Sequence, residues 1–211
     1  MKQLLLTLCL ALMMIGTANA EVITFDDFTI NGPEDNAPWS GYGFNWYNGG
    51  VATATQPSGY MNAAISGPNY FHSRWNPQTN FLVTITRSDM GNFDFNSAYF
   101  TAAWYNGLGL EMIGYRDGSE VRRSFAMLDT NVSQLLTVDF MDIDVLTLNT
   151  FGDNASPAFF PVVGTRHNFA MDNFSFSAEN GDVPPSVPEP STIAFMSIGL
   201  LGMFAWRRRK N

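Results

Sequence analysis

Residues 108–128, LGLEMIGYRDGSEVRRSFAML, contain the clearest evidence for the fold. Two candidate extended runs, Leu108–Tyr115 and Glu120–Leu128, are separated by Asp117-Gly118. Asp-Gly readily adopts the positive φ angles of a two-residue turn, and such a turn connects antiparallel strands. The segment therefore predicts a β-hairpin with its tip at Asp117-Gly118.

Short extended runs continue on both sides of this hairpin, and no segment has a convincing helical period. Phe81–Thr86 and Phe174–Phe176 alternate apolar and polar side chains, as half-buried strands do. Turn-forming pairs stand at Asn31-Gly32, Asn48-Gly49 and Asn106-Gly107. This pattern predicts an all-β domain, a single β-sandwich of the jelly-roll type. The other predicted strands are Val22–Phe25, Phe44–Trp46, Ala98–Trp104, Leu135–Phe140, Val145–Asn149 and Asn168–Phe176.

The part of the chain between its two ends is strongly acidic. All 19 acidic residues lie between Glu21 and Glu189, together with six arginines and no lysine, which gives a net charge of −13. Such a body repels phosphate backbones and anionic lipids, so the sequence argues against nucleic-acid binding and against adsorption to a membrane surface. Neutral sugars and divalent cations are compatible partners. The only cysteine is Cys9, so the domain is expected to fold without disulfides.

The N-terminus, MKQLLLTLCLALMMIGTANA, has the three parts of a secretion signal. Lys2 is the positive start, Leu4–Ile15 the apolar run, and Ala18-Asn19-Ala20 the small-residue cleavage site. Residues 1–20 are therefore predicted to be a signal peptide, cleaved after Ala20 by signal peptidase once the secretion machinery has exported the chain. An uncleaved membrane anchor is the alternative.

The C-terminus, VPEPSTIAFMSIGLLGMFAWRRRKN, also has three parts in a fixed order. The 15-residue apolar run would rise only ~22 Å as a helix, against a hydrocarbon core of ~30 Å. Basic residues resist translocation, so the terminal cluster would stop transfer with the body outside. The parts are the motif Pro188, Glu189 and Pro190, the apolar run Thr192–Trp206, and the basic cluster Arg207, Arg208, Arg209 and Lys210.

This layout resembles the PEP-CTERM sorting signal. The resemblance implies that Pro188-Glu189-Pro190 is recognised by an exosortase-like membrane enzyme, during transient insertion of the tail in the inner membrane. It also implies a host that makes exopolysaccharide. A simple C-terminal membrane anchor is the alternative. The expected organisation is a signal peptide (1–20), a β-sandwich (21–177), a linker (178–187) and a sorting signal with a short transmembrane helix (188–211).

Two stretches, VITFDDF near the start of the domain and NFAMDNFSF at its end, resemble the first and last strands of galactose-binding-like and carbohydrate-binding jelly rolls. The resemblance implies that these strands lie side by side, with a structural calcium near them. By strand parity Asp172 is expected on the same face as Phe174 and Phe176, where a buried carboxylate needs a partner. The expected calcium ligands are Asp172, Glu21, Asp26 and Asp27. The alternative is that Asp172 accepts backbone hydrogen bonds and binds no metal.

The motifs of the common enzyme classes are missing. The sequence has no Gly-x-Ser-x-Gly, His-Glu-x-x-His or phosphate-binding loop, and its two histidines, His72 and His167, have no nucleophile motif beside them. Two carboxylates are enough for a glycosidase. The densest acidic group, Asp139, Asp142 and Asp144, is more typical of solvated turn residues. No catalytic residue is therefore predicted, and a glycoside-active enzyme stays as an alternative.

The stretch GYGFNWYNGG gathers aromatic rings beside asparagine and glycine. Aromatic faces stack on sugar rings while amide side chains bond their hydroxyls, so Trp46, Tyr47 and Asn48 are the predicted ligand-binding residues. Core packing is the alternative for each ring. The predicted function is an exported cell-surface or extracellular matrix protein of a biofilm that binds polysaccharide without catalysis. A passive surface protein that binds another protein is a further alternative.

Overall fold

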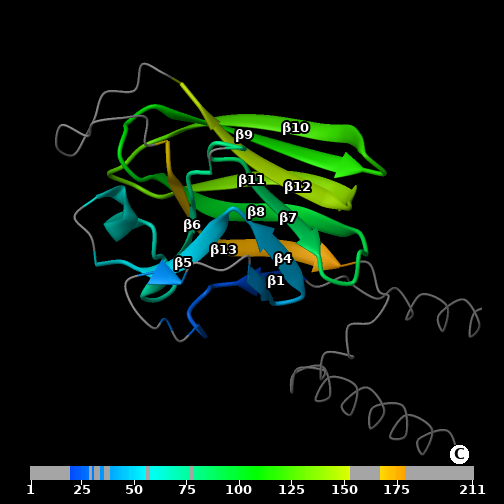
Figure 1. Ribbon diagram of the computed structural model, residues 1–211, viewed down its shortest axis with the longest axis horizontal. Helices are drawn as coiled ribbons and strands as arrows, with labels where there is room; N and C mark the ends of the chain where they lie inside the picture. The colour runs from blue at the N-terminus through cyan, green and yellow to red at the C-terminus, as the bar shows by residue number, and fades with distance from the viewer. Residues whose placement is uncertain are drawn as a thin grey trace, which may run out of the picture. The chain divides into compact units, whose positions relative to one another are not determined.

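The computed structural model describes residues 20–28, 30, 34–35, 39–55, 58–76, 78–152 and 167–178, which form two antiparallel sheets (Figure 1). This confirms the predicted all-β fold. No helix among these residues is long and apolar enough to cross a membrane. Several predicted features lie outside the described residues: the signal peptide before Ala20, the Asn31-Gly32 turn, the linker beyond Ala178, Pro188-Glu189-Pro190 and the basic C-terminus.

One sheet has seven strands in the order β11-β8-β13-β6-β5-β2, and β1 pairs with β13 beside this path. The first and last strands are therefore neighbours, as the jelly-roll resemblance implies, with Ile23 opposite Phe174. The strands are β1 (Glu21–Ile23), β2 (Glu34–Asp35), β5 (Gly49–Thr53), β6 (Asn69–Ser73), β8 (Phe93–Ala102), β11 (Gln134–Ile143) and β13 (Phe169–Ala178).

The second sheet has six strands in the order β10-β9-β12-β7-β4-β3. The predicted hairpin is formed by β9 and β10, and its tip has φ angles of 51° at Asp117 and 74° at Gly118, as a two-residue turn requires. The strands are β3 (Trp39–Gly41), β4 (Phe44–Tyr47), β7 (Val83–Arg87), β9 (Leu108–Arg116), β10 (Ser119–Leu128) and β12 (Val145–Phe151).

The inner faces of the two sheets form one aromatic core. Phe44 of the six-stranded sheet meets Phe93 and Phe176 of the seven-stranded sheet edge to face, with ring centroids 5.0 and 4.8 Å apart. Phe95 and Phe174, on adjacent strands β8 and β13, stack at 4.9 Å. Such pairs add specific geometry to the area they bury. The fold is thus stabilised by packing, without disulfides.

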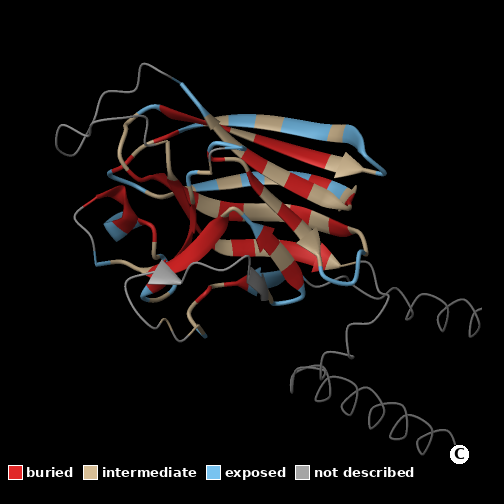
Figure 2. Cartoon of the chain, viewed as in Figure 1, coloured by how far each residue is buried: buried red, intermediate tan, exposed pale blue. Residues whose placement is uncertain are grey.

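The outer faces of the two sheets differ. A 3₁₀ helix, η1 (Gly59–Asn62), covers part of the outer face of the seven-stranded sheet, where Tyr60 stacks on Tyr70 at 5.2 Å and a second buried cluster forms around Ala170. The outer side of the hairpin strand β10 is mostly exposed instead (Figure 2). The outer side of the hairpin is therefore accessible to a binding partner.

Strands β5 and β6 were not predicted from the sequence. Most of their residues are buried on both faces, by the core on one side and on the other by η1 and the residues after it (59–66, here called the η1 segment). Their sequences, GGVAT and NYFHS, consequently lack the alternation that identifies a half-buried strand. Strands β2 and β3 contain only two and three residues.

Candidate functional site

The predicted ligand-binding residues Trp46, Tyr47 and Asn48 do not form one surface. Trp46 is buried in the core, with its ring 5.5 Å from that of Phe25 and 5.2 Å from that of Phe71. Its ring is therefore not available to a ligand. Trp46 packs in the core, which was the alternative to a binding role. Tyr47, the next residue of β4, points outward with 48% of its surface exposed.

Asn48 is half-buried, and its side chain connects two loops. Its Nδ2 donates to the carbonyl oxygens of Leu82 at 2.9 Å and Asn80 at 3.3 Å, and its own carbonyl accepts from the Arg74 amide at 3.0 Å. Its φ of 63° places it at the sharp turn into β5. Of the three predicted residues, Tyr47 alone presents its side chain to a ligand.

The parity argument for Asp172 is wrong, because β13 has a bulge. Between Asp172 and Ser175 the strand gains one residue relative to β8, and Asn173 in this bulge has a φ of 52°. Met171 before the bulge and Phe174 after it both belong to the core. Asp172 therefore points to the opposite face of the sheet, since an inserted residue shifts the alternation by one.

Asp172 is fully buried there, beneath the segment that follows η1. Its Oδ2 accepts hydrogen bonds from the amides of Ile65 at 2.7 Å and Ser66 at 3.1 Å, and its Oδ1 accepts from the Asn173 amide at 2.7 Å. The Ser66 hydroxyl lies 3.2 Å from Asp172 Oδ2 and 3.1 Å from Asp26 Oδ2. Two of the four expected calcium ligands, Asp26 and Asp172, thus meet at Ser66.

The donors around Asp172 do not fit a calcium ion at this carboxylate. Calcium is bound by oxygen ligands, whereas both oxygens of Asp172 face amide N–H groups. Glu21 pairs with Phe176, four residues beyond Asp172 along β13, and Asp27 is exposed to solvent. Across the described residues, no group of three or more His, Cys, Asp or Glu side chains is arranged to hold a metal. Burial raises the pKa of Asp172, and the surrounding hydrogen bonds oppose that rise.

The acidic group considered for catalysis lies at strand irregularities. Asp139 and Asp142, with φ angles of 48° and 54°, lie where the register of β11 shifts against β8. Asp142 pairs with Arg116, and Asp144 accepts the amide of Asp117 in the hairpin tip at 2.7 Å. These contacts hold the bulges and the turn in place.

The outer face of the six-stranded sheet carries a continuous set of outward side chains, here called the open sheet face. The strand register aligns Tyr47, Thr84, Thr147, Ile113 and Arg123 in one row across β4, β7, β12, β9 and β10. Five strands spaced ~4.8 Å apart give this row a length of ~19 Å. The open sheet face consists of this row together with Glu111, Asn149, Phe125, Met127 and Phe151.

One end of the open sheet face is apolar. Phe125, Met127 and Phe151 expose 60%, 58% and 42% of their surfaces, and the rings of Phe125 and Phe151 meet edge to face at 6.1 Å. Phe151 lies over Gly109, where an added Cβ would come within 2.5 Å of its ring. A glycine on β9 therefore gives the Phe151 ring the space it occupies.

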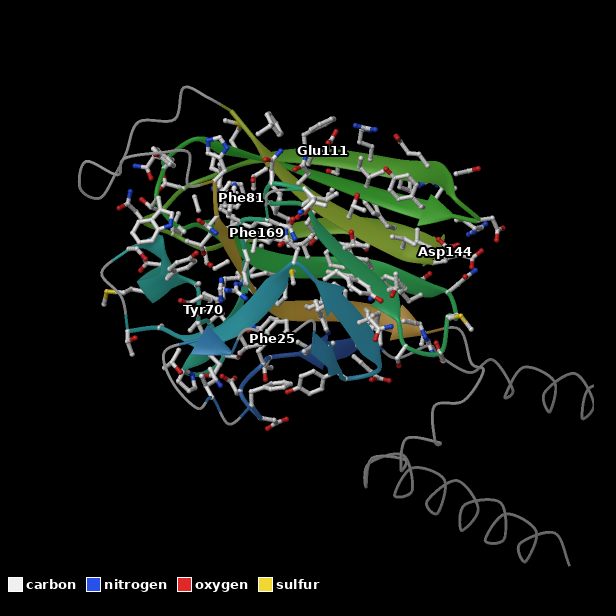
Figure 3. The ribbon with its side chains drawn as sticks, in the orientation of Figure 1. Phe25, Tyr70, Phe81, Glu111, Asp144 and Phe169 are labelled. Atoms are coloured by element: carbon white, nitrogen blue, oxygen red, sulfur yellow. The ribbon has the colours of Figure 1, made fainter. Side chains whose placement is uncertain are left out.

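Charged and polar side chains stand beside these rings: Glu111, which Figure 3 labels, is opposite Phe125 in the neighbouring strand. The Arg123 guanidinium lies 6.0 Å from the centroid of Phe125, and it pairs with both Glu111 and Glu120. The hydrogen bond from Arg123 lowers the pKa of Glu120, so this pair is charged at neutral pH. Asn149 is opposite Glu111 in the neighbouring strand. The two rings can stack on a sugar. The Asn149 amide, the Glu111 carboxylate and the Arg123 guanidinium can form hydrogen bonds with its hydroxyls.

One comparison with known protein families finds a sorting motif at the C-terminal end of the chain. Residues 186–210 match the model of the PEP-CTERM protein-sorting motif. The chain carries a PEP-CTERM sorting signal. The match includes Pro188-Glu189-Pro190 and the basic cluster up to Lys210, as the sequence predicted. A PEP-CTERM signal supports an exported protein that is sorted by an exosortase.

The chain is similar in part to three solved structures. The K2 cleaved adhesin domain of Lys-gingipain is 11% identical, with a TM-score of 0.44 over 77% of this chain and 100% of that one. A DUF4465 protein from Bacteroides ovatus is 10% identical, with a TM-score of 0.40 over 76% and 95%. An agarase is 11% identical, with a TM-score of 0.34 over 77% of this chain and 25% of the agarase. No curated protein matches the chain.

Proposed function

We propose that this exported PEP-CTERM protein is a non-enzymatic component of the cell surface or extracellular matrix, and that it binds neutral polysaccharide through the open sheet face. The observation that carries the proposal is the arrangement of the exposed rings of Phe125 and Phe151 beside Glu111, Arg123 and Asn149, on a sheet face that the other described strands leave open. Exposed aromatic rings next to fixed hydrogen-bonding groups suit a pyranose, which has an apolar face and a polar rim.

Charge narrows the class of polysaccharide. The acidic body, with six arginines against 19 acidic residues, would repel a uronate-rich or sulfated chain. On the open sheet face itself, the Arg123 charge is already paired with Glu111 and Glu120. A neutral chain running along the ~19 Å row of side chains meets none of this repulsion.

The proposal is tested by removing one ring of the apolar end. Phe151→Ala is expected to weaken binding to the host's neutral extracellular polysaccharide about tenfold, since stacking on one aromatic side chain is worth roughly 1–1.5 kcal/mol. The measurement is a binding isotherm by calorimetry on residues 21–178, which contain every described strand. Leu135→Ala is the matched control, because Leu135 is 52% exposed but lies on β11 of the other sheet.

Equal binding by Phe151→Ala and the unchanged protein would place the sugar elsewhere. Reducing-sugar release during the same titration would favour the glycosidase alternative. Binding to a surface protein of the host, with no affinity for any polysaccharide, would favour the protein-adhesion alternative.

A further inference from the structure

The four strands that end the two sheet orders are protected very unequally against pairing with another chain. A sheet edge presents unpaired N–H and C=O groups, and proteins protect it with short strands, bulges, lysine or proline. Strands β2 and β3 contain two and three residues. Strand β11 is interrupted by two register shifts and presents Asp139 and Asp142 at its bulges.

Strand β10 has few of these protections. It has ten residues and pairs with β9 on one side only. Its register is regular from Arg122 to Leu128, after one shift next to Glu120. Its second half, Ser124–Leu128, contains no charge, proline or glycine, and exposes Phe125 and Met127. Among the described edges, β10 is therefore the one suited to accept another strand.

We infer that two copies of this chain associate by antiparallel pairing of their β10 strands about a two-fold axis at Ser124. The two-fold relation gives the interface matching backbone groups, because the same strand faces itself in reverse. Each Arg123 then stands opposite the Phe125 of the second copy, and each Arg122 opposite its Ala126. No like charges are placed directly opposite one another in this register.

The local charge favours this strand over the rest of the surface for such a contact. The described domain is acidic overall, and two such domains repel each other. Along β10 the charges balance, because Arg122 and Arg123 lie beside Glu120 and Glu111. The paired charges along β10 therefore add little repulsion where two β10 strands meet.

The pairing would extend the six-stranded sheet into a continuous one that spans both copies. The two open sheet faces would then lie on the same side, because antiparallel partners keep their side chains on a common face. A single polysaccharide chain that contacts both faces is held more tightly than by one, through the higher effective concentration of the second site. The association itself does not depend on the ligand.

The experiment is cysteine cross-linking of the full chain, exported from a bacterial host and oxidised before a non-reducing gel. Ser124→Cys places two thiols across the axis at a Cα distance of ~4.5–5.5 Å, within the ~4.4–6.8 Å that a disulfide spans. The native chain has one cysteine, Cys9, in the N-terminal segment. We expect the linked dimer to form at least about tenfold more with Ser124→Cys than with Thr137→Cys, an exposed site on β11.

A second variant separates specific pairing from random collision. Adding Phe125→Lys to Ser124→Cys places a lysine opposite Arg123 of the second copy and is expected to abolish the cross-link without changing the thermal unfolding of the monomer. Three results would each overturn the inference. They are equal cross-linking at Ser124 and Thr137, no cross-link at Ser124 in folded protein, and a cross-link that survives Phe125→Lys.

Discussion

Replacing Asp172 with alanine is expected to lower the free energy of unfolding by about 3–5 kcal/mol. The substitution leaves the partly buried amides of Ile65, Ser66 and Asn173 without their acceptor, and each unsatisfied donor costs up to about 1–3 kcal/mol. It also releases the η1 segment from the last strand. Urea unfolding followed by tryptophan fluorescence measures the loss. Glu21→Ala on the adjacent strand is the control, because Glu21 is exposed and should change stability by less than about 0.5 kcal/mol.

The stability of the unchanged protein is expected to depend on pH through Asp172, and its response to calcium tests whether Asp172 binds that ion. Burial raises the pKa of Asp172 in the folded state, so the folded state binds this proton more readily than the unfolded state. The contribution of Asp172 to stability therefore falls as pH rises from its unfolded pKa through its folded one. Asp172→Asn should remove this part of the pH dependence. A large rise in unfolding free energy with calcium, lost in Asp172→Asn, would contradict the hydrogen-bonded arrangement described here.

Replacing Trp46 with alanine is expected to cost about 3–5 kcal/mol of stability, as for other large buried aromatic residues. Trp46 lies between Phe25, Phe71 and Phe174, and its Nε1 donates to the Gly41 carbonyl at 3.3 Å. Tyr47→Ala, one residue away on the exposed side of the same strand, should change stability by less than about 0.5 kcal/mol. Chemical unfolding of the two variants in parallel provides the comparison. A stable Trp46→Ala protein that had lost only ligand binding would restore the binding role predicted from the sequence.

The hairpin shows what the sequence can determine. Asp117-Gly118 readily adopts positive φ angles, and an extended run stands on each side of it, so local chemistry alone predicts the hairpin. Strands β5 and β6 could not be found in this way, because they are covered on both faces and their sequences therefore do not alternate. Asp172 was placed on the wrong face because one bulge residue, Asn173, reverses the alternation along β13.

The candidate site was only partly predictable. Parity along β4 correctly places Tyr47 opposite in direction to Phe44 and Trp46. Parity along β10 could also have indicated Phe125 and Met127, which alternate with the inward Ala126. The position of Phe151 beside these side chains could not be predicted, since it depends on how β10 and β12 each pair with β9. The PEP-CTERM signal was the easiest feature to predict, because its three parts are contiguous in sequence.

The central claim, that the open sheet face binds polysaccharide, is tested most directly by hydrogen–deuterium exchange. Residues 21–178 are compared with and without the host's extracellular polysaccharide, by mass spectrometry of peptides. We predict slower exchange in peptides from β9, β10 and β12, around Glu111, Phe125 and Phe151, with no change around Asp172. Protection confined to the η1 segment and β13, or no protection at saturating polysaccharide, would contradict the account.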